Sequence, residues 1–83
     1  MDDILINLEV PSITERFDLF VPPDLKISTL TEVIANSIQE LANGTYMVSG
    51  QEMLMLKDPE KLLNPAKSLA DYDIRDGAGL IIL

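Results

Sequence analysis

The chain has 83 residues, and its composition includes no cysteine, histidine or tryptophan. The length gives room for one domain, residues 1–83, which we expect to bury about 60–65% of the surface that the unfolded chain exposes. Without cysteine and histidine, the sequence excludes thiolate nucleophiles, the usual zinc sites and histidine acid–base catalysis. The net charge of −8 disfavours nucleic acid and anionic lipid as partners, because both repel an acidic surface.

Two strands joined by a turn are predicted at the start of the sequence. In residues 4–10 every second side chain is apolar, which is typical of a half-buried strand. A proline and a serine then predict a turn over residues 11–15, and residues 16–21 alternate again. Phe20 breaks this second alternation, so we expect it to be partly exposed or packed at an edge. The side chains expected to face inward are Ile4, Ile6, Leu8, Val10, Phe17, Leu19 and Val21.

A helix is predicted after the second strand, which two prolines end. Apolar residues then recur at i, i+3 and i+4, which indicates an amphipathic helix of about 14 residues. Thr29 and Glu32 fit a capping box at its start, and Gly44 stands where a left-handed residue commonly ends a helix. The side chains expected on the apolar face are Ile27, Leu30, Val33, Ile34, Ile38 and Leu41.

Short strands and turns are predicted in the rest of the chain. Residues 45–51 indicate a loop and residues 52–57 a strand, which the following Asp-Pro-Glu would turn. Residues 62–63 fit a very short strand, and residues 68–74 fit a single helical turn or a compact loop. Residues 80–83 predict a final strand, and its lack of polar alternation suits a central place in a sheet.

The order β-β-α-β-β-β indicates an α+β fold, in which one helix covers one face of a mixed sheet of four or five strands. Placing the first and last strands side by side at the centre would bury their apolar side chains against the helix. Each burial contributes roughly 1.5–3 kcal/mol, as an upper estimate. This arrangement is the β-grasp. The residues concerned are Ile4, Ile6, Leu80, Ile82, Leu30 and Ile34.

The segment 68–74 reads Ser-Leu-Ala-Asp-Tyr-Asp-Ile and is followed by Leu80 and Ile82. This pattern resembles the C-terminal half of ubiquitin-like proteins, in which a Leu-x-Asp-Tyr-x-Ile turn precedes the last strand. The Val-Pro-Pro exit from the second strand, with Ile27 opening the helix, is also similar, so the resemblance covers essentially the whole chain. It implies a ubiquitin-like β-grasp and a structural role for Tyr72, whose ring would pack while its hydroxyl bonds nearby backbone.

The length, the acidic balance and the Ile-Leu ending are similar, more narrowly, to the YukD-like (EsaB-like) family. These are small ubiquitin-like proteins associated with Gram-positive type VII secretion systems. The resemblance implies a non-catalytic accessory or regulatory component that contacts cytosolic parts of the membrane machinery. We expect a monomer or weak dimer that needs no cofactor or metal.

Signals for targeting and for membrane insertion are not predicted. The sequence opens with Met-Asp-Asp, whereas a secretory signal has a basic segment followed by an apolar one. No apolar run approaches the ~20 residues that cross a bilayer. We therefore expect a cytoplasmic protein without direct membrane insertion, which reaches the membrane periphery only through a partner.

Three other functions are possible for a fold of this kind. A ubiquitin-like carrier or modifier acts through an extended tail of two glycines, whereas this sequence ends on Leu83 in the predicted strand, so we expect no adenylation there. A regulatory adaptor unrelated to secretion is equally compatible with the sequence. An enzyme is disfavoured, because no carboxylate has an identifiable acid or base partner.

Asp71, Asp73 and Asp76 do not match the spacing of a calcium loop, so we expect turn and capping roles.

A partner-binding surface is predicted from the strand at residues 52–57, which is apolar on both faces. If Leu54 and Leu56 face the helix, as similarity to ubiquitin suggests, Met55 lies on the outer face of the sheet. Exposed apolar patches generally mark interfaces, and the matching region of ubiquitin-like folds is their usual partner-binding surface. The alternative is that the loop at residues 45–51 or a second copy of the chain covers this region. The residues expected to form the surface are Met55, Ile81 and Leu83, with Ile13 from the hairpin tip.

Overall fold

The computed structural model describes residues 2–83; Met1, the first residue of the predicted domain, lies outside the described residues. The elements follow the predicted order; one 3-10 turn lies within the predicted hairpin turn, and another lies within residues 68–74, for which a single helical turn was one of the two predicted alternatives. They are β1 (Ile4–Val10), η1 (Pro11–Ile13), β2 (Glu15–Val21), α1 (Ile27–Leu41), β3 (Leu54–Leu56), β4 (Lys61–Leu62), η2 (Ala70–Tyr72) and β5 (Ala78–Ile82).

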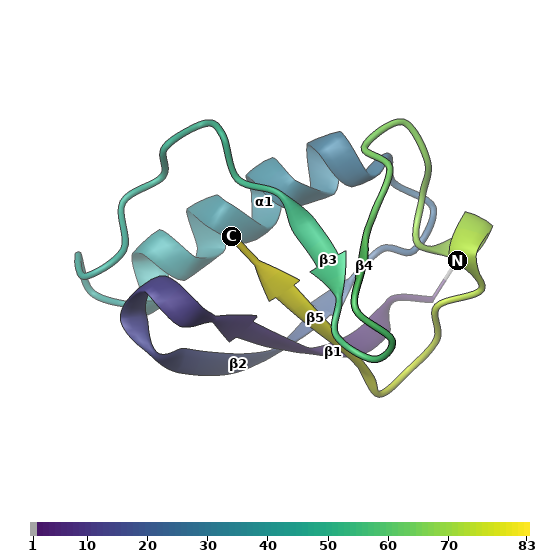
Figure 1. The fold of residues 1–83 in the computed structure, drawn as a ribbon. Coiled ribbons are helices and arrows are strands. Elements are labelled where there is room, and N and C mark those ends of the chain that lie inside the picture. The colour runs from purple at the N-terminus through teal and green to yellow at the C-terminus, as the bar shows by residue number, and fades with distance from the viewer. Residues whose placement is uncertain (1) are drawn as a thin grey trace.

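The five strands form one mixed sheet in the order β2-β1-β5-β3-β4. The first and last strands lie side by side in parallel at its centre, while the other neighbours are antiparallel. Figure 1 shows α1 lying across one face of this sheet. The predicted arrangement, a β-grasp with a single helix and the two ends of the chain paired in the middle, is confirmed.

The N-terminal hairpin forms because both of its strands are apolar on one face. Its register pairs Ile4 with Val21 at one end and Val10 with Glu15 at the other. The turn η1 lies between the strands, and Thr14 closes it in the left-handed region at φ 53°. Phe20 is exposed on the face away from the helix, as its break in the alternation predicts.

The core lies between α1 and the inner face of the sheet. Leu8 and Leu80 stand opposite each other on the two central strands, and both are fully buried. All seven inward-facing residues predicted from the two strands are buried or packed against this core, although Ile4, Phe17 and Leu19 are only half-buried. The core also takes up Tyr46, which belongs to the predicted loop and for which the sequence pattern gave no signal.

Two residues assigned to the apolar face of α1 are exposed, so the prediction for them is wrong. Val33 is 48% exposed and Leu41 is 57% exposed. Val33 lies to one side of the buried stripe, which takes in Thr31 and Ala35 instead, and Leu41 is the last residue of the helix. Thr31 can be buried because its hydroxyl donates to the carbonyl of Ile27 at 2.6 Å.

The capping box predicted at Thr29 and Glu32 is also wrong. The helix begins at Ile27, so Thr29 lies inside it, and no side chain caps its start. The first amides of α1 instead donate to a distant loop: Ile27 N–H to the carbonyl of Lys67 at 2.7 Å, and Ser28 N–H to that of Pro65 at 3.0 Å. This tertiary contact satisfies helix-end donors that a cap would otherwise serve.

The first left-handed residue after α1 is Asn43, one position before the glycine predicted to end the helix. Asn43 takes the left-handed conformation at φ 57°, and Gly44 follows it at φ 88°. Asparagine is one of the few residues other than glycine that adopts this region readily, so the helix can stop before the glycine.

The strands of the C-terminal half are displaced or shortened relative to the prediction. The strand expected at residues 52–57 is β3, which covers three residues. Its pairing with β5 nevertheless continues at both ends, because Met53 and Leu83 exchange backbone hydrogen bonds of 3.1 and 2.9 Å and Lys57 N–H donates to the carbonyl of Gly79. The backbone of Leu83 is thus held beside β3, although β5 ends at Ile82.

The turn at Tyr72 has the structural role that the resemblance implies. Its ring is half-buried against the core, and its hydroxyl accepts the N–H of Asn64 at 2.9 Å. The ammonium groups of Lys61 and Lys67 lie 5.1 and 5.6 Å from the ring centroid, within the range of a cation–π contact.

The three nearby aspartates have structural partners: those of Asp71 and Asp73 are local, as the predicted turn and capping roles imply, whereas that of Asp76 is distant in the sequence. Asp71 accepts the N–H of Ser68, Asp73 pairs with Arg75, and Asp76 accepts the N–H of Leu5 at 2.6 Å. The last of these bonds fixes the start of β1 against the turn that leads into β5.

Candidate functional site

The outer face of the sheet, opposite α1, carries three of the four predicted site residues. Met55 stands directly opposite Ile81 across the β3–β5 pairing. Because Leu80 and Ile82 are buried, the alternation of β5 places Ile81 and Leu83 on the outer face. We name Met55, Ile81 and Leu83 the outer apolar surface. Met55 and Ile81 are half-buried by their neighbours, while Leu83 is 58% exposed.

Two further apolar side chains adjoin this surface. Leu62 stands opposite Met55 across the β3–β4 pairing and is 53% exposed. Met53, whose backbone pairs with that of Leu83, is 48% exposed. Neither residue was among the predicted site residues, although the alternation of the predicted strand places Met53 on the same face as Met55. Leu62 belongs to a strand of only two residues, whose pairing partner the sequence does not specify.

Ile13 is placed differently from the other predicted residues. It lies in η1 at the end of the β1–β2 hairpin and is partly buried against the core cluster. This contact gives Ile13 a packing role, so we do not include it in the outer apolar surface.

A row of charges borders the outer apolar surface on the side of β1. The carboxylate of Glu9, whose residue stands opposite Ile81, lies 2.7 Å from the ammonium of Lys57 and 3.1 Å from the guanidinium of Arg16. The hydrogen bond from Lys57 is the main cause that holds the pKa of Glu9 below its ordinary value, with smaller contributions from both positive charges. We call the part of the outer face that carries these charges its charged half, although the exposed Phe20 of β2 also lies on this side.

The loop at residues 45–51 leaves the outer apolar surface uncovered. It runs beside α1 (Figure 1), where the N–H of Val48 donates to the side chain of Gln39 at 3.0 Å. Tyr46 is buried in the core, and Val48 packs against it. The loop thus belongs to the helix side of the molecule.

Glu52 holds this loop together. Its carboxylate accepts three hydrogen bonds: from the hydroxyl of Tyr46 at 2.9 Å and from the backbone N–H groups of Ser49 at 2.7 Å and Gly50 at 3.0 Å. Burial by itself raises the pKa of Glu52, but hydrogen bonds, among them those from the backbone of Ser49 and the hydroxyl of Tyr46, outweigh it and keep the pKa below the ordinary value. Burial, together with the bond to Glu52, raises the pKa of Tyr46 to about 12.

The described residues offer little for metal chemistry or for membrane insertion. Within residues 2–83, no three acidic side chains come close enough to hold a metal ion. In the same part of the chain, no helix combines the length and the apolar character that crossing a bilayer requires. Exposed apolar surfaces such as the outer apolar surface generally mark interfaces.

Comparisons with known proteins identify the fold. No family model matches the sequence, and no curated protein matches it either. Among solved structures, the ubiquitin-like domain of the Mycobacterium tuberculosis type VII secretion system protein EccD1 has a TM-score of 0.77 at 16% identity, over 100% of this chain and 99% of that one. The ubiquitin-like domain of Plasmodium falciparum Dsk2 has a TM-score of 0.69 at 18% identity, over 98% of this chain and 99% of that one.

A further similar structure is a component of a larger assembly. A chain of the MycP5-free ESX-5 inner membrane complex has a TM-score of 0.72 at 19% identity, and the match covers 100% of this chain but 21% of that one. At these identities the likeness establishes the fold alone, which is the ubiquitin-like β-grasp.

Proposed function

We propose that this chain, whose fold is the ubiquitin-like β-grasp, is a single-domain, non-catalytic component of a bacterial type VII secretion system, with an accessory or regulatory role. The observation that carries the proposal is the outer apolar surface, which is open to a partner in a fold shared with a domain of the secretion protein EccD1. The YukD-like resemblance of the sequence supports a cytoplasmic protein of Gram-positive bacteria.

The partner that we propose is a protein with a basic surface around an apolar centre, on the cytosolic side of the secretion machinery. The net charge of −8 steers the chain toward such a surface and away from acidic ones. Because steering acts through long-range charge, added salt should slow the association. The apolar contact itself should depend much less on salt.

Charged substitutions test whether the outer apolar surface binds the partner. We expect Met55→Glu and Ile81→Glu to abolish partner capture, because each buries a carboxylate without a counter-charge in an apolar contact. Val33→Glu is the matched control, since Val33 is an exposed apolar residue on the helix side. Unchanged capture by folded Met55→Glu and Ile81→Glu variants would eliminate this surface.

Co-purification from the native cell tests the link to secretion. Recovery of a membrane ATPase complex with the wild-type chain is the result that we expect. Recovery of an activating enzyme alone would contradict the proposal and identify a carrier or modifier. Recovery of soluble proteins unrelated to secretion would also contradict it and identify a regulatory adaptor.

A further inference from the structure

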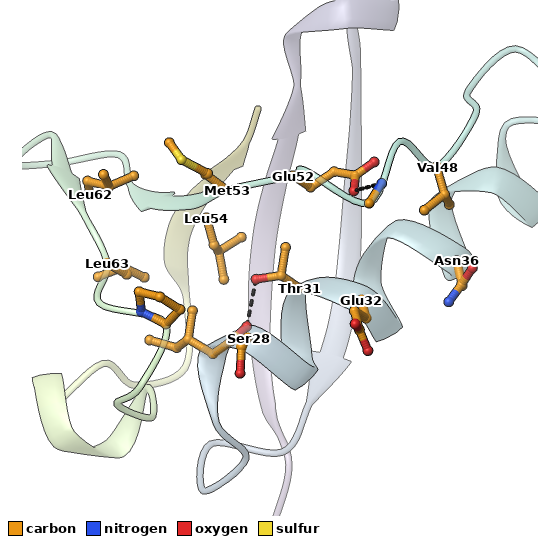
Figure 2. Close-up of a pocket in the computed structure, with 13 residues that line it drawn as sticks. Ser28, Thr31, Glu32, Asn36, Val48, Glu52, Met53, Leu54, Leu62 and Leu63 are labelled. Carbon is orange, nitrogen blue, oxygen red and sulfur yellow. Dashed lines mark hydrogen bonds between the residues drawn. The ribbon is translucent and has the colours of Figure 1, made fainter.

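A groove of about 490 Å³ lies at the β3–β4 edge of the sheet, between this edge and the first half of α1 (Figure 2). Its apolar floor comes from Ile27, Leu54 and Leu63, all of which belong to the buried core. The exposed side chains of Met53 and Leu62 form part of its border. A volume of this size is within the range of about 300–1,000 Å³ that is common for ligand pockets.

One wall of the groove is held in place by the hydrogen bonds around Glu52. Val48, Gly50 and Glu52 line this wall, and Figure 2 shows Glu52 turned back toward its own loop. The opposite wall is the helix, with Ser28, Thr31 and Glu32. Because both walls are tied to the core, a ligand would find the groove already formed, which lowers the entropy cost of binding.

The charged side chains that line the groove within residues 2–83 are all acidic. The residues that line it within the described part of the chain include two glutamates but no lysine or arginine. The carboxylate of Glu52 already accepts its three hydrogen bonds from the loop. Glu32 is exposed and takes part in none of the ion pairs found within residues 2–83. A single available carboxylate thus lies beside an apolar floor.

We propose that this groove binds a basic peptide segment of a protein partner. An aliphatic side chain of the segment fills the space over Leu54 and Leu63, and a neighbouring lysine or arginine pairs with Glu32. Charge complementarity selects this occupant, because an acidic segment would be repelled by both glutamates and by the net charge of −8. The same repulsion disfavours a second copy of this chain, which carries the same net negative charge.

The groove adjoins the outer apolar surface through two residues, Leu62 and Met53, that lie next to that surface and also line the groove. Leu62 stands opposite Met55, and the backbone of Met53 pairs with that of Leu83, while both side chains also line the groove. A partner that covers the outer apolar surface can therefore extend around the β3–β4 edge into the groove. The inference rests on the proposed function only in that the chain binds proteins, and the two sites are tested separately.

The test is a titration of the ¹⁵N-labelled chain, followed by NMR, with the peptide acetyl-Gly-Lys-Leu-Leu-Lys-Gly-amide and with its counterpart in which glutamates replace both lysines. We expect saturable shifts at the amides of Thr31, Leu54 and Leu63 with the basic peptide, and none with the acidic one. Ser28→Phe fills the groove and should weaken binding about ten-fold or more, whereas Thr29→Phe, on the same turn but outside the groove, should not.

A second matched pair tests the charge. Glu32→Gln should weaken binding of the basic peptide about two- to five-fold, as expected for an exposed ion pair, while Glu40→Gln on the same helix should leave it unchanged. Shifts confined to Met55, Ile81 and Leu83, equal binding of both peptides, or no saturable shift would each overturn the groove proposal. None of these results affects the proposed function. That proposal is contradicted only by unchanged partner capture by the folded Met55→Glu and Ile81→Glu variants, or by co-purification without a secretion component.

Discussion

The two faces of the sheet are built from the same strands but differ in burial. On the inner face Leu8 and Leu80 stand opposite each other and are fully buried under α1. One residue further along each strand, Glu9 and Ile81 stand opposite each other on the outer face, and neither is fully buried. Because strand side chains alternate, the inner face can determine the fold while the outer face remains free for binding.

The outer face itself carries charged side chains on one side and apolar side chains on the other, and the candidate site lies on the apolar side. Its β1 side carries the ion pairs of Glu9 with Arg16 and Lys57, which are exposed contacts of small energetic value. Its β5 and β3 strands carry apolar side chains that gain little from contact with water. The comparison predicts that adjacent residues of one strand differ strongly in their effect on stability.

The largest effect is expected from truncation on the inner face. Leu80→Ala should lower the free energy of unfolding by about 2–5 kcal/mol, because it leaves a cavity in a closely packed core. Ile81→Ala, one residue away, should cost less than half of that loss. Urea denaturation followed by circular dichroism measures both. Equal losses would show that the two faces are not as different as their burial indicates.

A smaller effect is expected at Glu52 on the helix side. Glu52→Gln should cost about 1–2 kcal/mol at neutral pH, because it weakens hydrogen bonds to a charged acceptor. The pKa of Glu52 is lowered in the folded state, so its stabilisation is present above the ordinary value of 4.5 and is lost as the pH falls through the folded pKa. The stability difference between wild type and variant should therefore shrink in acid, as urea denaturation at neutral and at acidic pH would show. A difference independent of pH would contradict this role.

The smallest effect is expected at Glu9 in the charged half of the outer face. Glu9→Gln should shift the unfolding midpoint only slightly, and half-molar sodium chloride should remove the shift because it screens exposed charges. Asp24→Asn, which changes an exposed carboxylate outside these ion pairs, is the control. A loss comparable to that of Leu80→Ala would mean that the charged half of the outer face is part of the structural core.

Most of the fold could be predicted from periodicity, because burial acts on every second strand residue and on one side of the helix. The errors occur where distant segments meet. The start of α1 is satisfied by the carbonyls of Pro65 and Lys67, and no local pattern reports such a contact. Val33 and Leu41 fit the helical spacing but are exposed, because Val33 lies beside the buried stripe and Leu41 is the last residue of α1. Tyr46 is buried although its neighbours form a loop.

The candidate site could be predicted in part. The apolar character of both faces of β3 left its orientation open, and the similarity to ubiquitin pointed to Met55 as the outward residue. The alternation of β5 indicated Ile81 and Leu83. The groove could not be predicted, because its walls come from α1, from the loop before β3 and from the segment after β4. Only the folded chain brings Glu32, Leu54 and Leu63 to one place.

The most direct test of the account is to find what lies against the outer face when the partner is bound. We would place benzoylphenylalanine at position 81 in one variant and at position 33 in another, irradiate the native cells, and identify the cross-linked products by mass spectrometry. We expect a specific cross-linked product with a secretion-system protein when benzoylphenylalanine replaces Ile81, and no such product when it replaces Val33. The same product from position 33 alone, or from both positions equally, would contradict it.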